Sequence, residues 1–126
     1  MSQENVELVE AIYNAWKSGV SAREFIHPEL EYVNPPDAVE PGTRIGRRNL
    51  ARIRDVYDGV EVRPYRVVDA GDDVVVLATL AGTSRVAGVP VDIDQGYVWT
   101  IRDGQAVRFR WFRTPQEALE AVGLRE

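Results

Sequence analysis

Two neutral polar side chains near the end of a short apolar stretch could hold a water molecule or a substrate. Tyr32 and Asn34 stand two residues apart in LEYVNPPD (30–37), so in a strand they would point to the same side, and two prolines would then end that strand. Both groups can form hydrogen bonds, but an amide has no useful proton affinity near pH 7. The pair therefore predicts either a polar corner of a ligand pocket or a strand end at which Asn34 bonds the backbone.

The other side chains that could do chemistry are scattered. His27 is the only histidine, and it could be a base or a metal ligand, but its place before Pro28 favours a bond to the last carbonyls of a helix. Asp92 and Asp94 share the side of a predicted strand that points away from its aromatic residues, which favours solvent or dimer contact. Since the chain has no cysteine and no convergent histidines and carboxylates, we expect no metal and no cofactor.

The composition fits one globular domain over residues 1–126. Fifteen basic and twenty acidic residues give a net charge of −5, which disfavours nucleic-acid binding and docking on anionic membranes. No stretch approaches the roughly 18 apolar residues of a membrane span, and the N-terminal residues do not resemble a signal peptide. We therefore expect a cytoplasmic protein with neither a nucleic-acid nor a membrane partner.

The elements that must position these side chains follow from hydrophobic periodicity. Apolar residues at helical spacing predict helices, and alternating β-branched and aromatic residues predict strands. The expected helices cover 2–18, a short segment that begins at Ser21 and ends by His27, 47–59 and 114–123. The expected strands cover 30–34, 60–69, 73–83, 91–102 and 105–113. The order α-α-β-α-β-β-β-β-α predicts an α+β fold in which one curved antiparallel sheet carries helices on one face.

The last two strands place large rings on one side. Gln95, Tyr97 and Trp99 alternate along the first of them, and Phe109 and Trp111 along the second. Large rings fill the space inside a bent sheet, and they also line small-molecule pockets. The pattern leaves open whether these residues form a pocket or a filled core.

The opposite sides of the same strands are also apolar in part. Val75, Leu77 and Val98 fall there, and no further predicted element remains to cover them. A sheet that is apolar on both faces usually has both faces covered. We therefore expect a homodimer that forms through this outer face.

Several stretches together resemble a SnoaL-like domain of the NTF2-like superfamily, and the resemblance extends over nearly the whole chain. It rests on the order of elements and on VELVEAIYNAWKSG, IHPELEY, VVDAGDDVVVLATLAG, YVWTIRDGQAVRF and PQEALEAVGL. It implies a cone-shaped domain with helices on the concave face of the sheet, one apolar pocket, and commonly a dimer. Related proteins include ketosteroid isomerases, polyketide cyclases and limonene epoxide hydrolase, so the resemblance implies an isomerase, a cyclase or a hydrolase that acts on a ring compound.

The catalytic groups of the isomerases and cyclases are largely missing at the matching positions. Where ketosteroid isomerase has two hydrogen-bond donors and an aspartate base, this chain has Ile12, Tyr97 and Asn34, and only Tyr97 can stabilise an oxyanion. Where a cyclase has an aspartate and a histidine, it has Trp111 and Tyr97.

The epoxide hydrolase is similar in one part of its site. Tyr32 and Asn34 match the pair that holds its attacking water, but its Asp-Arg-Asp set falls on Leu80, Ala78 and Trp111. The known catalytic carboxylates of all three enzyme types are therefore absent here.

Two hypotheses follow. In the first, the protein binds a small apolar or hydroxylated ring compound, Tyr97 donates to an oxyanion, and Tyr32 with Asn34 positions water or substrate. The predicted lining is Trp16, Tyr32, Asn34, Gln95, Tyr97, Trp99, Phe109 and Trp111. In the second, the same aromatic residues fill the cone, and the protein is a non-catalytic dimeric structural or interaction module.

Overall fold

The computed structural model describes residues 2–124 of the chain. In these residues three α-helices and two 3₁₀ helices (η1 and η2) combine with six strands. In chain order the elements are α1 (Ser2–Lys17), η1 (Arg23–Phe25), β1 (Ile26–Asn34), β2 (Gly42–Ile45), η2 (Arg47–Arg52), α2 (Ile53–Val56), β3 (Tyr57–Ala70), β4 (Asp73–Ser84), β5 (Pro90–Arg102), β6 (Gln105–Phe112) and α3 (Pro115–Ala121).

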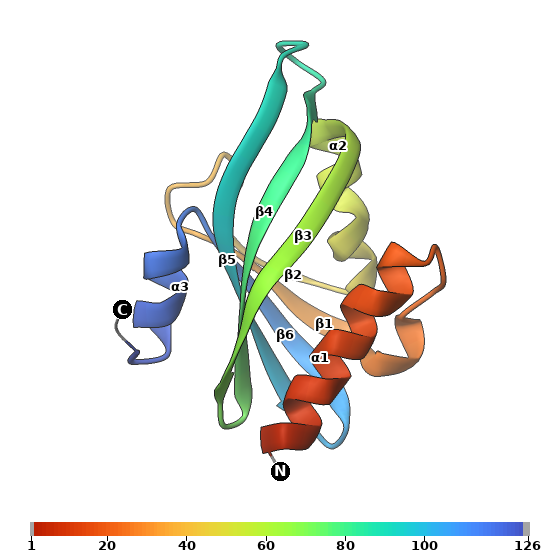
Figure 1. Ribbon diagram of the computed structural model, residues 1–126, viewed down its shortest axis with the longest axis vertical. Helices are drawn as coiled ribbons and strands as arrows, with labels where there is room; N and C mark the ends of the chain where they lie inside the picture. The colour runs from red at the N-terminus through yellow and green to blue at the C-terminus, as the bar shows by residue number, and fades with distance from the viewer. Residues whose placement is uncertain (1, 125–126) are drawn as a thin grey trace.

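The six strands form one strongly curved sheet in the order β2-β1-β6-β5-β4-β3 (Figure 1). The strands from β3 to β6 form a meander, in which each strand is antiparallel to the next. β1 pairs antiparallel with β2 but parallel with β6. The first strand of the chain therefore lies beside the last one.

The α+β fold class predicted from the sequence is confirmed, and the structure adds details that the patterns did not indicate. The sheet is mixed, because β1 returns to the far edge of the meander and meets β6 in the parallel direction. β2 lies within the predicted loop 35–46, and its four residues are all exposed, so no apolar alternation marks it. The predicted helix 47–59 ends at Val56, and Tyr57 already has the extended backbone of β3.

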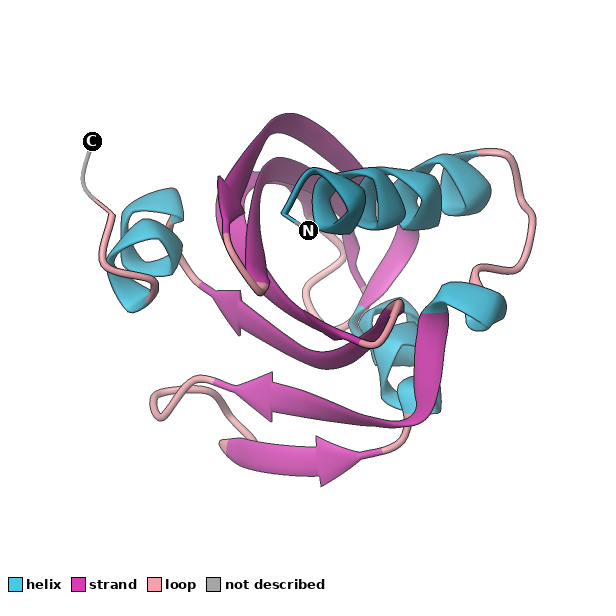
Figure 2. Ribbon diagram, turned by 90° about the horizontal axis from the view of Figure 1, so that it is seen from below, coloured by secondary structure: helices cyan, strands magenta, loops and turns pink. Residues whose placement is uncertain are grey.

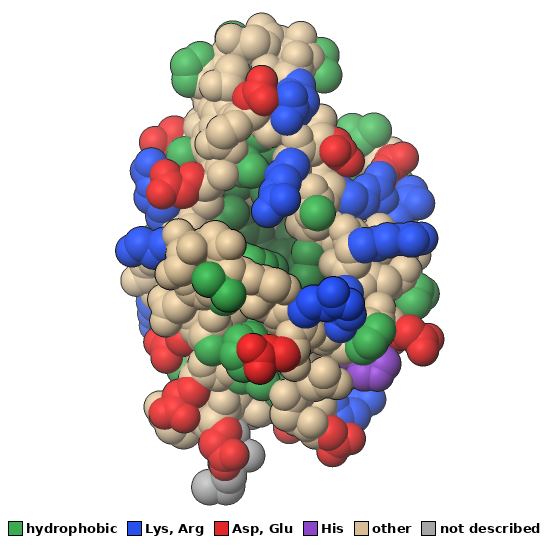
Figure 3. Space-filling model, turned by 90° about the vertical axis from the view of Figure 1, so that its right-hand side faces the viewer, with side chains coloured by type: hydrophobic (Ala, Val, Ile, Leu, Met, Phe, Trp, Pro, Cys, Tyr) green, Lys and Arg blue, Asp and Glu red, His purple; other side chains and the backbone are tan. Residues whose placement is uncertain are grey.

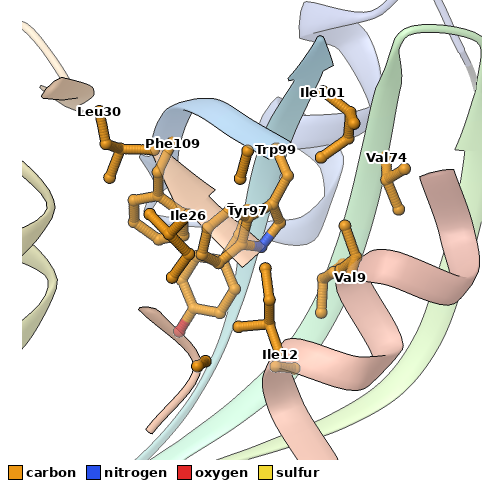
Figure 4. Packing of buried hydrophobic residues seen from close by; sticks show 13 residues of the cluster. Val9, Ile12, Ile26, Leu30, Val74, Tyr97, Trp99, Ile101 and Phe109 are labelled. Carbon is orange, nitrogen blue, oxygen red and sulfur yellow. The ribbon is translucent and has the colours of Figure 1, made fainter. Parts of the chain in front are cut away.

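Helix α1 covers the concave face of the sheet. Its Val9 and Ile12 are fully buried and belong to the same cluster as Val74 and Trp99 (Figure 4). Burial of a side chain of this size contributes about 1.5–3 kcal/mol to stability. This helix therefore packs its apolar side onto the concave face of the sheet.

Helix α3 lies on the opposite face of the sheet, away from α1 (Figure 2). Thr114 caps it, because its hydroxyl accepts a hydrogen bond from the Glu117 amide at 3.2 Å. Its Ala118 and Leu119 are buried in one cluster with three outer-face residues of the sheet, Val75, Leu77 and Val98. The prediction that no element covers these outer residues is therefore wrong: the C-terminal helix does so.

Gly96 allows this helix to come close to the sheet. A Cβ at position 96 would lie 2.3 Å from the Cβ of Ala118 and 3.2 Å from the Cα of Pro115. The side chain of the neighbouring residue, Tyr97, belongs to the inner cluster. One glycine on β5 thus makes room for a helix on the side of the sheet opposite the rings.

None of the helices within residues 2–124 is long and apolar enough to cross a membrane.

We expect Gly96→Ala to lower the free energy of unfolding by about 1–3 kcal/mol, because the added methyl group overpacks the contact with Ala118. Urea unfolding followed by circular dichroism measures this loss. The matched background is Ala118→Gly, which by itself costs about 1 kcal/mol of helix propensity. Gly96→Ala should cost less in that background than in the native chain, and equal costs in both would contradict the proposed contact.

Candidate functional site

The wide end of the cone holds an open cavity of about 1870 Å³. Its wall is built from the end of α1, from η2 and α2, and from the concave faces of the strands. Figure 3 shows the opening as a hollow with hydrophobic side chains at its base and charged ones around it. The cone is therefore open at this end and is not filled throughout.

Aromatic rings form the floor of the cavity. Tyr32 of β1 stacks on Phe109 of β6, with ring centroids 5.4 Å apart and an interplanar angle of 28°. The ring centroid of Tyr97, on β5, lies 5.5 Å from that of Phe109. Because Tyr97 pairs with Trp111 across the β5–β6 ladder, the alternation of both strands brings these rings to one face.

Trp99 lies behind this floor and does not line the cavity. It is completely buried, and its Nε1 donates a hydrogen bond to the Tyr13 hydroxyl at 3.1 Å. Its ring lies 4.7 Å from the Phe109 ring (Figure 4) and 6.0 Å from the Trp16 ring, measured between centroids. Trp16, in contrast, is 39% exposed and lines the opening at the end of α1. Trp99 thus fills the core, while the cavity begins in front of it.

Asn34 holds the polar corner together. Its Oδ1 accepts a hydrogen bond from Trp111 Nε1 at 2.8 Å, and its Nδ2 donates one to the Gly42 carbonyl at 3.3 Å. The amide therefore joins β1 to β6 and to the start of β2. The Tyr32 hydroxyl beside it has no hydrogen-bond partner among the described residues, so it is free to bond a ligand.

Gln95 and Tyr97 form a buried polar pair on β5. The Tyr97 hydroxyl donates a hydrogen bond to Gln95 Oε1 at 3.0 Å. Burial raises the pKa of the Tyr97 phenol well above its usual range, and it raises the pKa of the Tyr32 phenol in the same direction. Both phenols are neutral at physiological pH, where they serve as hydrogen-bond donors and acceptors and not as bases.

Seven of the eight residues predicted to line a pocket do line the cavity, and Trp99 is the one that does not. His27 is outside it, where its Nδ1 accepts a hydrogen bond from the Glu29 amide at 3.0 Å. Asp92 and Asp94 are also outside it, and Asp94 accepts a hydrogen bond from the Thr79 hydroxyl at 2.9 Å. Residues 2–124 contain no group of three or more side chains that could hold a metal ion.

The floor of the cavity carries no carboxylate. The four acidic residues in the wall are all exposed. They are Glu10, Glu40, Asp55 and Glu61. Glu40 forms ion pairs with Arg52 and, at 3.6 Å, with Arg44. The floor can bind and orient a ring compound, but it offers no group with the proton affinity of a general base.

The sequence patterns did not indicate the part of the wall that η2, α2 and β3 provide. Leu50, Ile53 and Val62 contribute apolar surface to it, and several arginines contribute charge. The arginine-rich stretch 47–54 (RRNLARIR) is the signal that could have indicated this wall. Helical periodicity predicts only a helix over 47–59, and it does not indicate that this segment borders a cavity.

The curved α+β cone with an aromatic cavity is a fold shared with NTF2-like proteins. Residues 9–109 match the family model described as the SnoaL-like domain, and this chain belongs to that family. No curated protein matches the chain.

Solved structures share the fold. An NTF2-like protein from Burkholderia thailandensis is 24% identical with a TM-score of 0.74, over 87% of this chain and 90% of that one. TerC, co-crystallised with polyporic acid, is 26% identical with a TM-score of 0.71, over 94% and 98%. A protein from Jannaschia sp. CCS1 named as a SnoaL-like polyketide cyclase is 22% identical with a TM-score of 0.72, over 89% and 86%.

The buried phenols predict a loss of stability in alkali. Because burial raises the pKa of Tyr13, Tyr32 and Tyr97, the unfolded chain releases these protons near pH 10 while the folded chain keeps them. The free energy of unfolding should therefore fall as the pH rises above about 10, by up to about 1.4 kcal/mol per pH unit for each tyrosine.

Urea unfolding between about pH 9 and pH 11 measures this slope. Tyr97→Phe should make it shallower, since one raised phenol is removed. Phe112→Leu, on the outer face, is the control that changes stability without changing the slope. An unchanged slope in Tyr97→Phe would contradict the assignment.

Proposed function

We propose that this chain is a cytoplasmic SnoaL-like protein that binds a small ring compound carrying carbonyl or hydroxyl groups. The observation that carries the proposal is the open cavity whose floor is the stack of Tyr32 on Phe109, flanked by Tyr97. Flat rings bind such floors by stacking and by burial of apolar area. The Tyr32 hydroxyl and the polar corner at Asn34 supply the few hydrogen bonds that orient the ligand.

Two of the similar proteins support this ligand class. TerC was crystallised with polyporic acid, and the Jannaschia protein is named as a polyketide cyclase. Neither name assigns a reaction to this chain, because proteins of one fold catalyse unrelated reactions. What they support is a ring compound as the occupant of the cavity.

If the protein is an isomerase, cyclase or hydrolase, its reaction uses neutral groups on the floor. Tyr32 would donate a hydrogen bond to an oxygen that gains charge, and Tyr97 would do so after turning its hydroxyl away from Gln95 Oε1. Asn34 would position the ligand beside Trp111. Because the floor lacks a carboxylate, the proton acceptor would be the ligand itself or water at the open end. The filled-core alternative has less support, since the cavity leaves the wide end of the cone empty.

A titration of the protein with polyporic acid and a panel of smaller hydroxylated aromatic compounds tests the proposal. Trp16 and Trp111 line the cavity, so we expect saturable quenching of tryptophan fluorescence, confirmed by calorimetry. Tyr32→Leu should weaken binding about two- to tenfold, because it removes the stacked ring. Tyr32→Phe, which keeps the ring and loses the hydroxyl, should have the smaller effect.

Phe112→Leu is the matched control, because it removes a ring from the outer face of the sheet and should leave binding unchanged. Absence of saturable binding by every compound, in both fluorescence and calorimetry, would refute the proposal.

We also propose a homodimer through the part of the outer sheet face that α3 leaves uncovered. Arg108 and Arg110 of β6 lie there, paired with Glu31 at 3.6 Å and with Asp73 at 3.7 Å. The buried Nε atom of Arg108 is the one that faces Glu31, at a distance too long for a hydrogen bond, and the buried Nε atom of Arg110 has no hydrogen-bond partner in the described part of the chain. A buried donor without a partner is costly, and a second copy of the chain could supply the acceptors.

We expect the protein to sediment at about twice its chain mass of 14.2 kDa at micromolar concentration. Arg108→Glu would face Glu31 with a like charge and should shift the protein towards the monomer. A native protein that sediments as a 14.2 kDa species at this concentration would contradict the dimer.

A further inference from the structure

The charge of the cavity wall is opposite to that of the rest of the protein. The wall contains eight basic and four acidic side chains, a formal charge of +4. The chain as a whole carries −5, so its remaining residues carry −9. The basic members are Lys17, Arg23, Arg47, Arg52, Arg54, Arg63, Arg66 and Arg113. More than half of the basic residues of an acidic protein therefore surround one opening (Figure 3).

We propose that the ligand of this cavity is an anion, namely a ring compound that carries an acidic group, with its rings on the aromatic floor and its negative charge among the guanidinium groups at the opening. This inference rests on the proposed binding function and specifies its ligand class. Each part of such a molecule matches a different part of the cavity. The floor is apolar and uncharged and suits the rings, and the opening is cationic and suits the acidic group.

Several of the cationic groups have no carboxylate partner. Among residues 2–124, Lys17, Arg23 and Arg54 form no ion pair, and the Arg47 guanidinium donates only to the carbonyls of Arg23 and Ile26, at 3.2 and 3.0 Å. A surface that serves only for solubility would be expected to mix both signs of charge. A concave wall with excess charge of one sign concentrates oppositely charged ligands, which the acidic remainder of this protein repels.

Arg52 connects the opening to the floor. Its guanidinium is close enough to Tyr32 to oppose the rise that burial causes in the pKa of that phenol. It also forms an ion pair with Glu40, which belongs to the loop between β1 and β2. An acidic group of a ligand that stacks on Tyr32 would lie next to Arg52 and would compete with Glu40 for it.

Two fluorescent probes with the same ring system test the inference. 8-Anilinonaphthalene-1-sulfonate carries a negative charge, and N-phenyl-1-naphthylamine is its neutral counterpart without the sulfonate. We expect both to bind saturably, because both can occupy the aromatic floor. Only the affinity of the sulfonate probe should fall as salt is raised, since salt screens the guanidinium groups.

Variants at the opening separate charge from shape. Arg52→Gln and Arg54→Gln should each weaken binding of the sulfonate probe about two- to fivefold, and Glu40→Gln should strengthen it by a similar factor, because it releases Arg52. Binding of the neutral probe should not change in any of them. Arg102→Gln, at an exposed position outside the cavity wall, removes the same charge and should affect neither probe.

The outcomes are distinct. The inference is supported if the affinity for the sulfonate probe falls in Arg52→Gln and Arg54→Gln and rises in Glu40→Gln, while the affinity for the neutral probe stays constant. If the neutral probe binds but the sulfonate affinity is the same in all variants, the anionic ligand class is wrong while the proposed binding function stands. If neither probe binds to variants and native protein that unfold normally in urea, the proposed function fails and the inference fails with it.

Discussion

The register between β5 and β6 is the constraint on which the rest of the structure depends. It sets Tyr97 opposite Trp111 and Trp99 opposite Phe109, so these four rings share the concave face. The same register turns Val98 and Gly96 to the convex face, where α3 packs. A slip by one residue would turn the rings outward and remove the space for the helix at once, because side chains alternate along a strand. One ladder of hydrogen bonds thus defines the floor of the cavity and the support behind the sheet.

Within the cavity, the division between a neutral floor and a charged opening limits the chemistry. Phenols, an amide and an indole can align an oxygen-bearing ring, but they cannot remove a proton at neutral pH. The charged groups lie at the opening, where water screens them and where Arg52 forms an ion pair with Glu40. The arrangement therefore favours selection and orientation of a ligand over general base catalysis by the protein.

The sequence was sufficient to predict the features that depend on local alternation. The rings of β5 and β6 and the pair Tyr32 and Asn34 line the cavity because strand parity is a property of the chain itself. Trp99 is on the predicted face but lies behind the floor of the cavity, because strand parity gives the face of a sheet and not the position along the cavity. The contact between α3 and the sheet depends on Gly96, and a glycine in a strand does not indicate which segment will pack against it. The parallel pairing of β1 with β6 and the η2 wall depend on contacts between distant segments, which periodicity does not encode.

The bond between Asn34 and Trp111 joins residues 77 positions apart. Contacts of this separation close a long loop, and proteins dominated by them fold slowly. During synthesis, α1 and β1 emerge well before the residues that complete the cone. The apolar side of β1 therefore stays unpaired until β6 has been made. The cavity thus forms only after β6 has been synthesised, and a ligand that stabilises it would act on the step in which β6 pairs with β1.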